Sequence, residues 1–167
     1  NEGNALAMAT GYYLASGRIP MVFMQNSGIG NATNPLASLC DKQVYSIPVL
    51  LLIGRRGESG VPDEPQHITQ GEITIAQLDA MRIPWMILSD TEVECERQIA
   101  KAIQILLSSS TPVALIARKG SFSPYKSKQE KSPSAVCASL TREESIQCGA
   151  GSLPPEARVF STTGMIS

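Results

Sequence analysis

Glu2 is the side chain with the clearest potential for chemistry in this sequence. It stands at the start of Asn1-Glu2-Gly3-Asn4-Ala5-Leu6-Ala7-Met8-Ala9, a segment that predicts a helix with apolar residues on almost every side. Helices of that kind are normally buried, and a buried carboxylate without a partner costs several kcal/mol. Glu2 is therefore either an acid–base group that faces a ligand or an acid that balances the helix dipole from the first turn.

A second candidate is the glycine-containing segment Gln25–Pro35, which follows a predicted apolar strand. We expect a loop here, because glycine lets a backbone approach a ligand closely. The segment lacks the third glycine of the GxGxxG dinucleotide pattern, although Arg55 and Arg56 after the next strand could meet a 2′-phosphate. Ser27 lacks the GxSxG context of a hydrolase nucleophile.

A third candidate is the long polar stretch from Gly54 to Gly71, which holds the only histidine of the chain, His67. Long loops in compact domains are usually functional or mobile. His67 is either a solvated loop residue or a group close to a substrate. Arg55 and Arg56 either contact an anionic substrate or form the solvated end of a strand.

These candidates need a scaffold, and the order of predicted elements supplies one. Apolar runs predict strands at 20–25, 48–53, 84–88 and 112–117. Helices are expected at 2–16, from Asn34 with Pro35 at its first position, from Thr74, and from Ser89. The last of these would turn one apolar face to the core, made of Ile99, Ile103, Leu106 and Leu107. Alternating helices and strands predict an α/β doubly wound parallel sheet.

Several motifs, taken in order, resemble the thiamine diphosphate-dependent 2-oxo acid decarboxylases, and most closely the pyrimidine-binding domain of the phosphonopyruvate decarboxylases. They are Asn1-Glu2-Gly3-Asn4-Ala5, Met24-Gln25-Asn26-Ser27-Gly28-Ile29-Gly30-Asn31, Asn34-Pro35-Leu36, Ile47-Pro48-Val49-Leu50-Leu51-Leu52-Ile53-Gly54-Arg55-Arg56-Gly57-Glu58, Asp63-Glu64-Pro65-Gln66-His67 and Ser161-Thr162-Thr163-Gly164. The resemblance covers nearly the whole chain except about residues 120–139.

The resemblance implies a role for each matched residue. Glu2 would be catalytic, because the glutamate at this place in the family hydrogen-bonds the aminopyrimidine of thiamine diphosphate and relays a proton. The implied cofactor-binding residues are Glu2, Asn26, Ser27, Gly28, Ile29, Asn31, Thr162, Thr163 and Gly164. The implied substrate-binding residues are Asp63, Gln66 and His67. The family also uses Mg²⁺, whose ligands we expect outside this segment.

The resemblance also suggests how the chain is divided. Residues 1–118 would form the pyrimidine-binding domain, without the strand and helix that precede the glutamate in the family. Residues 119–140 are rich in Ser, Lys and Pro and predict a linker. Residues 141–167 would begin the diphosphate-binding domain. We therefore expect a fragment of a larger chain that is inactive in isolation.

The composition of the chain limits the kinds of partner and the cellular compartment that we expect for it. A net charge of -1 with 17% charged residues gives no electrostatic case for nucleic acid or an anionic membrane. The apolar runs are too short to span a bilayer. The four cysteines show no CxxC spacing and, with one histidine, no zinc pattern. Such cysteines are typical of free thiols in a reducing compartment, so we expect a cytoplasmic protein.

The expected activity is decarboxylation of 3-phosphonopyruvate to phosphonoacetaldehyde and CO₂, as a carboxy-lyase of phosphonate biosynthesis. Sulfopyruvate decarboxylase, whose domains are often split between subunits, is one alternative. A non-catalytic cofactor-binding or interface module is another. The expected partners are a small 2-oxo acid and either a second copy of the chain, as in a homo-oligomer, or a subunit that carries the diphosphate domain.

Overall fold

A computed structural model describes residues 1–123 of the chain. The predicted linker beyond residue 123, the predicted start of a second domain at 141–167, and the predicted cofactor residues Thr162, Thr163 and Gly164 lie outside the described residues. The described residues belong to the first compact unit of the chain.

The core of this unit is a four-stranded parallel sheet, which confirms the predicted fold class. The strands are β1 (Met21–Gln25), β2 (Leu50–Gly54), β3 (Trp85–Ile87) and β4 (Val113–Ala117), in the spatial order β1-β2-β4-β3. All three pairings are parallel. Every residue of β4 is buried, as expected for an interior strand with only apolar side chains. The carboxyl ends of all four strands therefore lie along one edge of the sheet.

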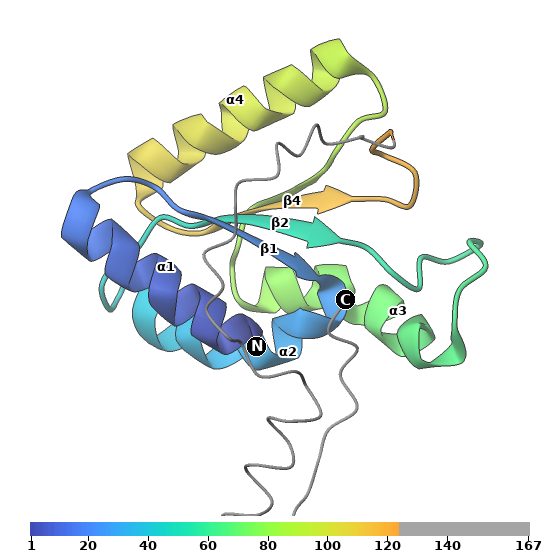
Figure 1. Cartoon of the computed structure of the whole chain (residues 1–167), viewed down its shortest axis with the longest axis horizontal. Helices are drawn as coiled ribbons and strands as arrows, with labels where there is room; N and C mark the ends of the chain where they lie inside the picture. The colour runs from blue at the N-terminus through green and yellow to red at the C-terminus, as the bar shows by residue number, and fades with distance from the viewer. Residues whose placement is uncertain (124–167) are drawn as a thin grey trace, which may run out of the picture. The chain divides into compact units, whose positions relative to one another are not determined.

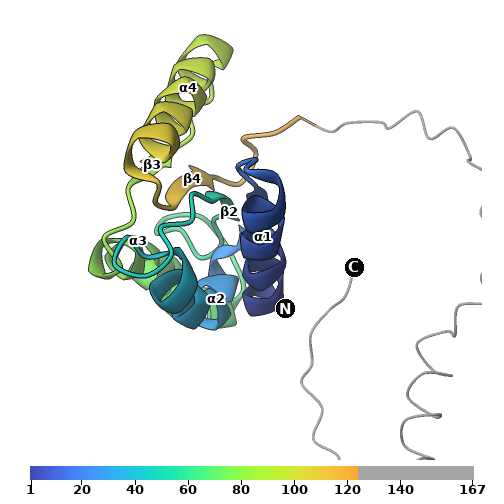
Figure 2. The ribbon, with the colours of Figure 1, turned by 90° about the vertical axis from the view of Figure 1, so that its left-hand side faces the viewer.

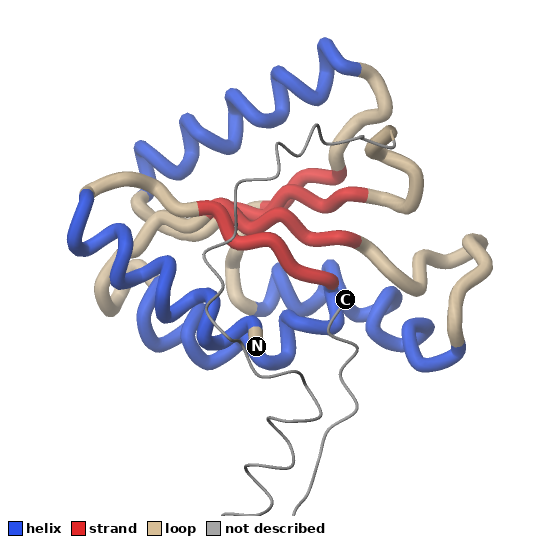
Figure 3. The backbone as a smooth tube through the Cα atoms, viewed as in Figure 1, coloured by secondary structure: helices blue, strands red, loops and turns tan. Residues whose placement is uncertain are grey.

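Helices cover both faces of the sheet, so the fold is doubly wound (Figure 1). The helices are α1 (Glu2–Ser16), α2 (Ile29–Pro35), α3 (Pro65–Ala80) and α4 (Glu92–Ser109). α1, α2 and α3 pack on one face and α4 on the other, as the side view and the tube also show (Figures 2 and 3). Each layer has its own cluster of buried apolar side chains.

α1 has the predicted boundaries. Its N-cap, Asn1, accepts a hydrogen bond from the backbone N–H of Asn4 at 3.3 Å, and it ends at Gly17, whose φ of 67° suits glycine. The helix is less buried than its composition suggests, because only Leu6, Ala9 and Thr10 are buried. Among the described residues nothing covers its other side.

The predicted loop after β1 is wrong, because residues 26–40 are helical throughout. A 3-10 turn at Asn26–Gly28 runs into α2 and then into a π-helical turn at Leu36–Cys40. Pro35 lies inside this helical segment instead of at a first position. The overlooked signal is a row of apolar residues at helical spacing, all of them buried: Ile29, Ala32, Leu36 and Cys40.

α3 begins nine residues before the predicted start at Thr74. It begins at Pro65, which suits a first helical turn because the missing N–H would have no partner there. Thr74 is fully buried within the helix and donates its hydroxyl to the carbonyl oxygen of Gln70 at 2.6 Å. The irregular stretch after β2 is therefore residues 55–64, which is shorter than predicted.

α4 turns a different face to the sheet than predicted. Its buried residues are Ala102 and Leu106, whereas Ile103 is 44% and Leu107 69% exposed. The small Ala102 side chain lies where the helix approaches β4. The predicted capping box at Ser89 is also absent, because Thr91 makes no capping hydrogen bond through its side chain. Gln98 instead accepts from the Ser89 N–H and donates to the carbonyl oxygen of Ile87, both at 2.8 Å.

Candidate functional site

Most of the predicted site residues meet at the carboxyl edge of the sheet. Asn26 directly follows β1, and the 55–64 loop directly follows β2. α1 packs against α2, which brings Glu2 at the start of α1 to Gly28 and Asn31 at the start of α2. Ligands of open parallel α/β sheets bind outside this edge.

Glu2 is held in place by Asn31. The Asn31 side-chain amide donates to Glu2 Oε2 at 2.9 Å, and no side chain among residues 1–123 donates to Oε1. This amide, and then the backbone N–H of Glu2 itself, keep the pKa of Glu2 below its ordinary value. Glu2 is half-buried, so its carboxylate is ionised and within reach of a ligand.

Gly28 is required by this arrangement. A Cβ atom at position 28 would lie 2.4 Å from Cγ and 2.9 Å from Oε1 of Glu2. The residue has ordinary helical dihedral angles, so close approach, and not backbone freedom, explains the glycine. The close approach at Gly28 is to the Glu2 side chain, and the approach of a ligand to this backbone stays a prediction.

Asn26 joins the end of β1 to the loop after β2. Its Nδ2 donates at 2.9 Å both to the carbonyl oxygen of Arg56 and to Oγ1 of Thr74, and its Oδ1 accepts from the Arg56 N–H at 3.1 Å. The residue is 2% exposed. The structure therefore turns its amide into the protein, where it positions the 55–64 loop.

Two other predicted cofactor residues lie beside Asn26. Ser27 Oγ accepts a hydrogen bond from Nε2 of Gln25 at 3.0 Å. Ile29 is 1% exposed and packs into the core below the helix start. Ile29 therefore supports Gly28 from inside and offers no polar group to a ligand.

Asp63 organises the 55–64 loop. Its carboxylate accepts from Nε of Arg56 and from the backbone N–H groups of Gly57 and Glu64, the last two at 2.8 Å. It also lies 2.9 Å from Nδ1 of His67. The Arg56 guanidinium is the largest reason why the pKa of Asp63 lies far below its ordinary value of 3.8. Its oxygens are thus occupied within the protein.

This contact orients His67. Because an ionised carboxylate can only accept, Nδ1 of His67 carries the hydrogen and Nε2 is left for another partner. The side chain of His67 is 14% exposed. Gln66, in contrast, is exposed and makes no side-chain hydrogen bond to the described residues. Of the predicted substrate residues, Asp63 and His67 are therefore both held in a fixed geometry, and His67 is the one with an atom, Nε2, left for another partner.

The loop and α3 interlock at two glycines. A Cβ atom on Gly71 would lie 1.8 Å from the carbonyl oxygen of Gly57, and one on Gly57 would lie 1.8 Å from that of His67. Gly57 also has a φ of 67°, a conformation that L side chains rarely adopt. This contact fixes the distance between the Arg56–Asp63 pair and His67.

A cationic cavity of about 490 Å³ lies at the same edge, across the ends of β1, β2 and β4. We call it the cationic cavity; it is lined by Phe23, Gln25, Gly54, Arg55, Arg56, Ala117, Arg118 and Lys119. Sequence analysis missed Arg118 and Lys119. The feature of the sequence that could have identified them is their position directly after an apolar strand, which they share with Arg55 and Arg56.

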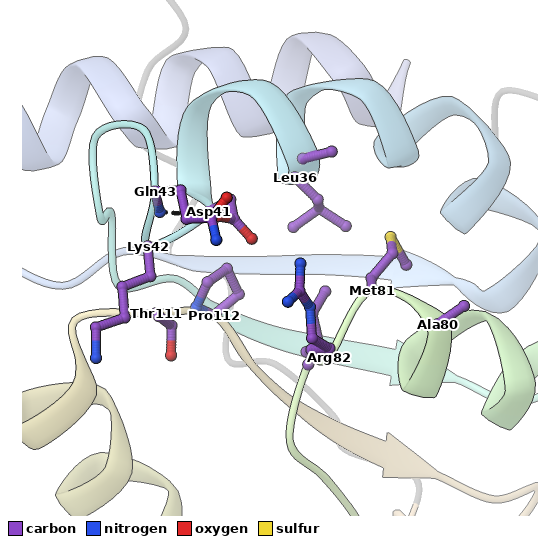
Figure 4. Close-up of a pocket in the computed structure, with 11 residues that line it drawn as sticks. Leu36, Asp41, Lys42, Gln43, Ala80, Met81, Arg82, Thr111 and Pro112 are labelled. Atoms are coloured by element: carbon purple, nitrogen blue, oxygen red, sulfur yellow. Dashed lines mark hydrogen bonds between the residues drawn. The ribbon is translucent and has the colours of Figure 1, made fainter.

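A second cavity, of about 390 Å³, lies at the opposite edge (Figure 4). Leu36, Met81, Ile83 and Pro112 supply apolar walls, and Arg82 projects into it from the end of α3. None of the predicted site residues lines it.

The described residues contain neither a cluster of metal-ligating side chains nor a membrane-spanning helix. Within residues 1–123 no three His, Cys, Asp or Glu side chains are grouped as a metal site would require. The same part of the chain contains no helix long and apolar enough to cross a membrane.

Comparison with known proteins gives a consistent picture. The family described as thiamine pyrophosphate enzyme, N-terminal TPP-binding domain, matches residues 1–80. The chain is 33% identical to the phosphonopyruvate decarboxylase of Streptomyces viridochromogenes and 30% identical to that of Streptomyces hygroscopicus. Each match covers 99% of the chain and 44% of the relative, so the chain spans less than half the length of these enzymes.

The chain also matches a protein that is shorter than the two phosphonopyruvate decarboxylases. The chain is 32% identical to the sulfopyruvate decarboxylase subunit alpha of Methanothermobacter thermautotrophicus. That match covers 69% of the chain and 67% of the relative.

Proposed function

The chain belongs to the thiamine diphosphate-dependent decarboxylase family, and from that premise we propose that it is the pyrimidine-binding part of a carboxy-lyase that converts 3-phosphonopyruvate to phosphonoacetaldehyde and CO₂. The observation that carries the proposal is the Glu2 carboxylate, fixed by Asn31 against Gly28 at the carboxyl edge of the sheet. The matches to two phosphonopyruvate decarboxylases support the choice of substrate.

The Glu2 site fits the aminopyrimidine part of thiamine diphosphate. One carboxylate oxygen is bound by Asn31, and no described side chain donates to the other, which can accept from a ring nitrogen that carries a proton. The glycine at position 28 makes room for the Glu2 side chain itself, so the carboxylate can keep this position. The residues that would hold the diphosphate and Mg²⁺ are proposed to lie outside residues 1–123, at Thr162, Thr163 and Gly164 and in a further domain.

The chain's own residues would divide the work as follows. Thiamine diphosphate supplies the electron sink for decarboxylation when it is bound. Glu2 would hold and release the proton that activates the cofactor, because one of its carboxylate oxygens has no side-chain donor among residues 1–123. Asn31 keeps that carboxylate in place. His67, oriented by Asp63, would donate or accept a proton at the substrate through Nε2.

The active assembly is proposed to need more than this unit. We propose that residues 119–140 link it to a diphosphate-binding domain that begins at 141–167. That domain would hold the cofactor against Glu2. It would belong either to a second copy of the chain, in a homo-oligomer, or to a separate subunit. Residues 1–167 alone would then be inactive. The free thiols of Cys40 and Cys95 support a cytoplasmic location.

Sulfopyruvate decarboxylase is the second candidate. The observation in its favour is the match to an alpha subunit of that enzyme, which covers two thirds of the relative's length. The two substrates share a 2-oxo acid skeleton and differ in the anionic group on C3. A non-catalytic cofactor-binding or interface module is the third, and it would bind thiamine diphosphate without turnover.

The test is a CO₂-release assay of the native protein with thiamine diphosphate and Mg²⁺, supplied with 3-phosphonopyruvate or sulfopyruvate. Faster turnover of 3-phosphonopyruvate is the expected result. Preference for sulfopyruvate would move the assignment to the second candidate. Cofactor binding without CO₂ release from either acid would leave only the non-catalytic module.

A further inference from the structure

We propose that the cationic cavity binds the anionic group on C3 of the substrate, with a phosphonate dianion as its best match. The inference rests on the proposed function, since it names the part of the protein that would select a substrate of this class. It concerns Arg118 and Lys119, which neither the sequence motifs nor the family match assign.

The charge balance of the cavity is positive. Its cations are Arg55, Arg56, Arg118 and Lys119. Glu58 pairs with Arg55 and with Arg118, and Asp63 pairs with Arg56. Four cations against two carboxylates leave two positive charges. A phosphonate dianion would neutralise them, whereas a sulfonate would neutralise one.

Free donors accompany this charge. Glu58 pairs with Nε of Arg118 at 3.0 Å, and the two terminal nitrogens of that guanidinium donate no hydrogen bond to residues 1–123. Lys119 has no acidic partner among residues 1–123. Nε of Arg55 is buried and has no acceptor in the same part of the chain. Guanidinium and ammonium groups arranged in this way suit the several oxygens of a tetrahedral anion.

The charges of the cavity differ in exposure. The side chains of Arg55 and Glu58 are only 14% and 17% exposed, whereas those of Arg56 and Arg118 are 43% and 48% exposed and Lys119 is exposed. Interactions between charges that are partly withdrawn from water are screened less by salt than those on an open surface. The attraction of an anion to Arg118 and Lys119 is therefore screened by salt, and its attraction to Arg55 is screened less.

Two residues of the cavity wall contact groups beside the catalytic candidates. Gln25 donates to Ser27, which precedes the glycine packed against Glu2. Arg56 pairs with the Asp63 that orients His67. A short substrate whose anionic end lies at Arg118 and Lys119 would therefore have its 2-oxo acid end toward His67, while Glu2 serves the cofactor.

The cavity at the opposite edge provides a matched comparison. Arg82 lines it and has no ion-pair partner among the described residues. It lies beyond the amino ends of the strands, away from every predicted site residue. Arg82→Gln removes the same charge as Arg118→Gln without touching the site.

The first measurement is steady-state kinetics of the native protein with 3-phosphonopyruvate. Because charge-assisted hydrogen bonds are among the strongest polar contacts, Arg118→Gln combined with Lys119→Gln should raise KM by roughly 10- to 100-fold. The kcat should change by less than about threefold, because these residues do not touch the reacting carbon. Arg82→Gln should leave both constants unchanged.

The second measurement needs no catalysis. Methylphosphonate is titrated into the native protein and followed by ³¹P NMR, and the affinity of methanesulfonate, which contains no phosphorus, is measured from its displacement of bound methylphosphonate. The double variant should lose at least about tenfold in methylphosphonate affinity while its melting temperature stays that of the wild type. Tighter binding of methanesulfonate than of methylphosphonate would overturn the phosphonate assignment in favour of a sulfonate.

Unchanged KM and unchanged methylphosphonate affinity in the double variant would overturn the proposal. If instead the proposed function were wrong, the native protein would release no CO₂. Methylphosphonate binding would still depend on Arg118 and Lys119, so the two failures can be distinguished. A variant that melts early is replaced by Arg118→Lys with Lys119→Arg, which keep the charges and should restore anion binding.

Discussion

At the residue scale, two carboxylates with lowered pKa values have different surroundings. Glu2 keeps one oxygen without a side-chain donor in the described part of the chain, whereas Asp63 uses both of its oxygens within its own loop. A carboxylate whose two oxygens both accept hydrogen bonds inside its own loop positions its neighbours. A carboxylate with one oxygen that has no donor can accept a hydrogen bond from a ligand. The geometry thus separates a proposed acid–base group from a positioning residue.

Glu2→Gln in the native protein should lower turnover by about 10²–10⁴-fold, the usual contribution of a general acid–base group. Glutamine keeps the size of the side chain but cannot exchange a proton with a ring nitrogen. The sharpest measurement is deuterium exchange at C2 of the thiazolium in wild type and variant. Equal exchange rates would show that Glu2 only balances the helix dipole, a role worth less than about 1 kcal/mol of stability.

Asp63→Asn should lower the melting temperature at neutral pH and alter the pH dependence of stability. The pKa of Asp63 is depressed on folding from an ordinary value of 3.8, so its stabilising contribution is present above that value and is lost as the pH falls below it. The difference in melting temperature between wild type and variant should be constant from about pH 8 to about pH 5 and shrink below about pH 4. A difference that persists undiminished at about pH 2 would exclude the carboxylate charge as its source.

At the element scale, the packing of the helices decides which residues can reach a ligand. α2 begins directly after Gly28, where the chain lies against Glu2 at the start of α1. α3 packs through Gly71 against Gly57 in the loop that follows β2. A glycine contact therefore fixes the position of each of these helices beside the site.

The glycines at these contacts act by making space and not by making the backbone flexible. A side chain at position 28 would displace Glu2, and one at position 71 would displace the backbone of Gly57. These glycines are therefore part of the site although they carry none of its charges.

Arg82→Gly should stabilise the chain by about 0.5–1 kcal/mol. Arg82 follows the end of α3 with a φ of 56°, a left-handed conformation that costs an L residue about 1 kcal/mol and suits glycine. Thermal unfolding of wild type and variant measures the effect. Lys42 lines the same cavity without a positive φ, so Lys42→Gly should not stabilise and serves as the control. A loss of stability in Arg82→Gly would show that the guanidinium itself stabilises the cavity.

At the scale of the whole molecule, α1 and the neighbouring strand β1 present apolar side chains that the described residues leave uncovered. Met8 is 77% and Phe23 69% exposed, and together with Tyr12 and Met21 they line one groove. β1 is also the end strand of the sheet in this part of the chain. Contiguous apolar surface of this kind is typical of interfaces, and we predict that α1 contacts a second copy of the chain or a diphosphate-domain subunit.

Met8→Lys with Tyr12→Lys should therefore weaken assembly of the native protein and lower its activity in parallel. Analytical ultracentrifugation over a range of concentrations gives the assembly state. Leu107→Lys, at a similarly exposed apolar position on α4, is the control and should sediment as the wild type does. A fully active monomer, or a double variant that assembles normally, would refute an interface at α1.

The sequence by itself determined the fold class, the span of α1, the four strands to within a few residues, and the family. These features depend on neighbours along the chain: apolar runs, a glycine at a helix end, and ordered motifs. Prediction failed at residues 26–33, where the glycines suggested a loop, and it put the start of the following helix at Asn34-Pro35, where the chain is already helical. There, burial of Ile29 and Leu36 against α1 outweighed the local turn preferences.

Only the tertiary structure decided which distant residues meet. The strand order places β4 beside β2, so Arg118 comes next to Glu58 and Arg55, which lie far from it in the sequence. The contacts of Glu2 with Asn31 and of Asn26 with Thr74 likewise cross between elements. Local patterns specify that an element forms, but the face that a helix such as α4 buries and the pairing order of the strands depend on the packing of the whole sheet, and that order assembled the cationic cavity.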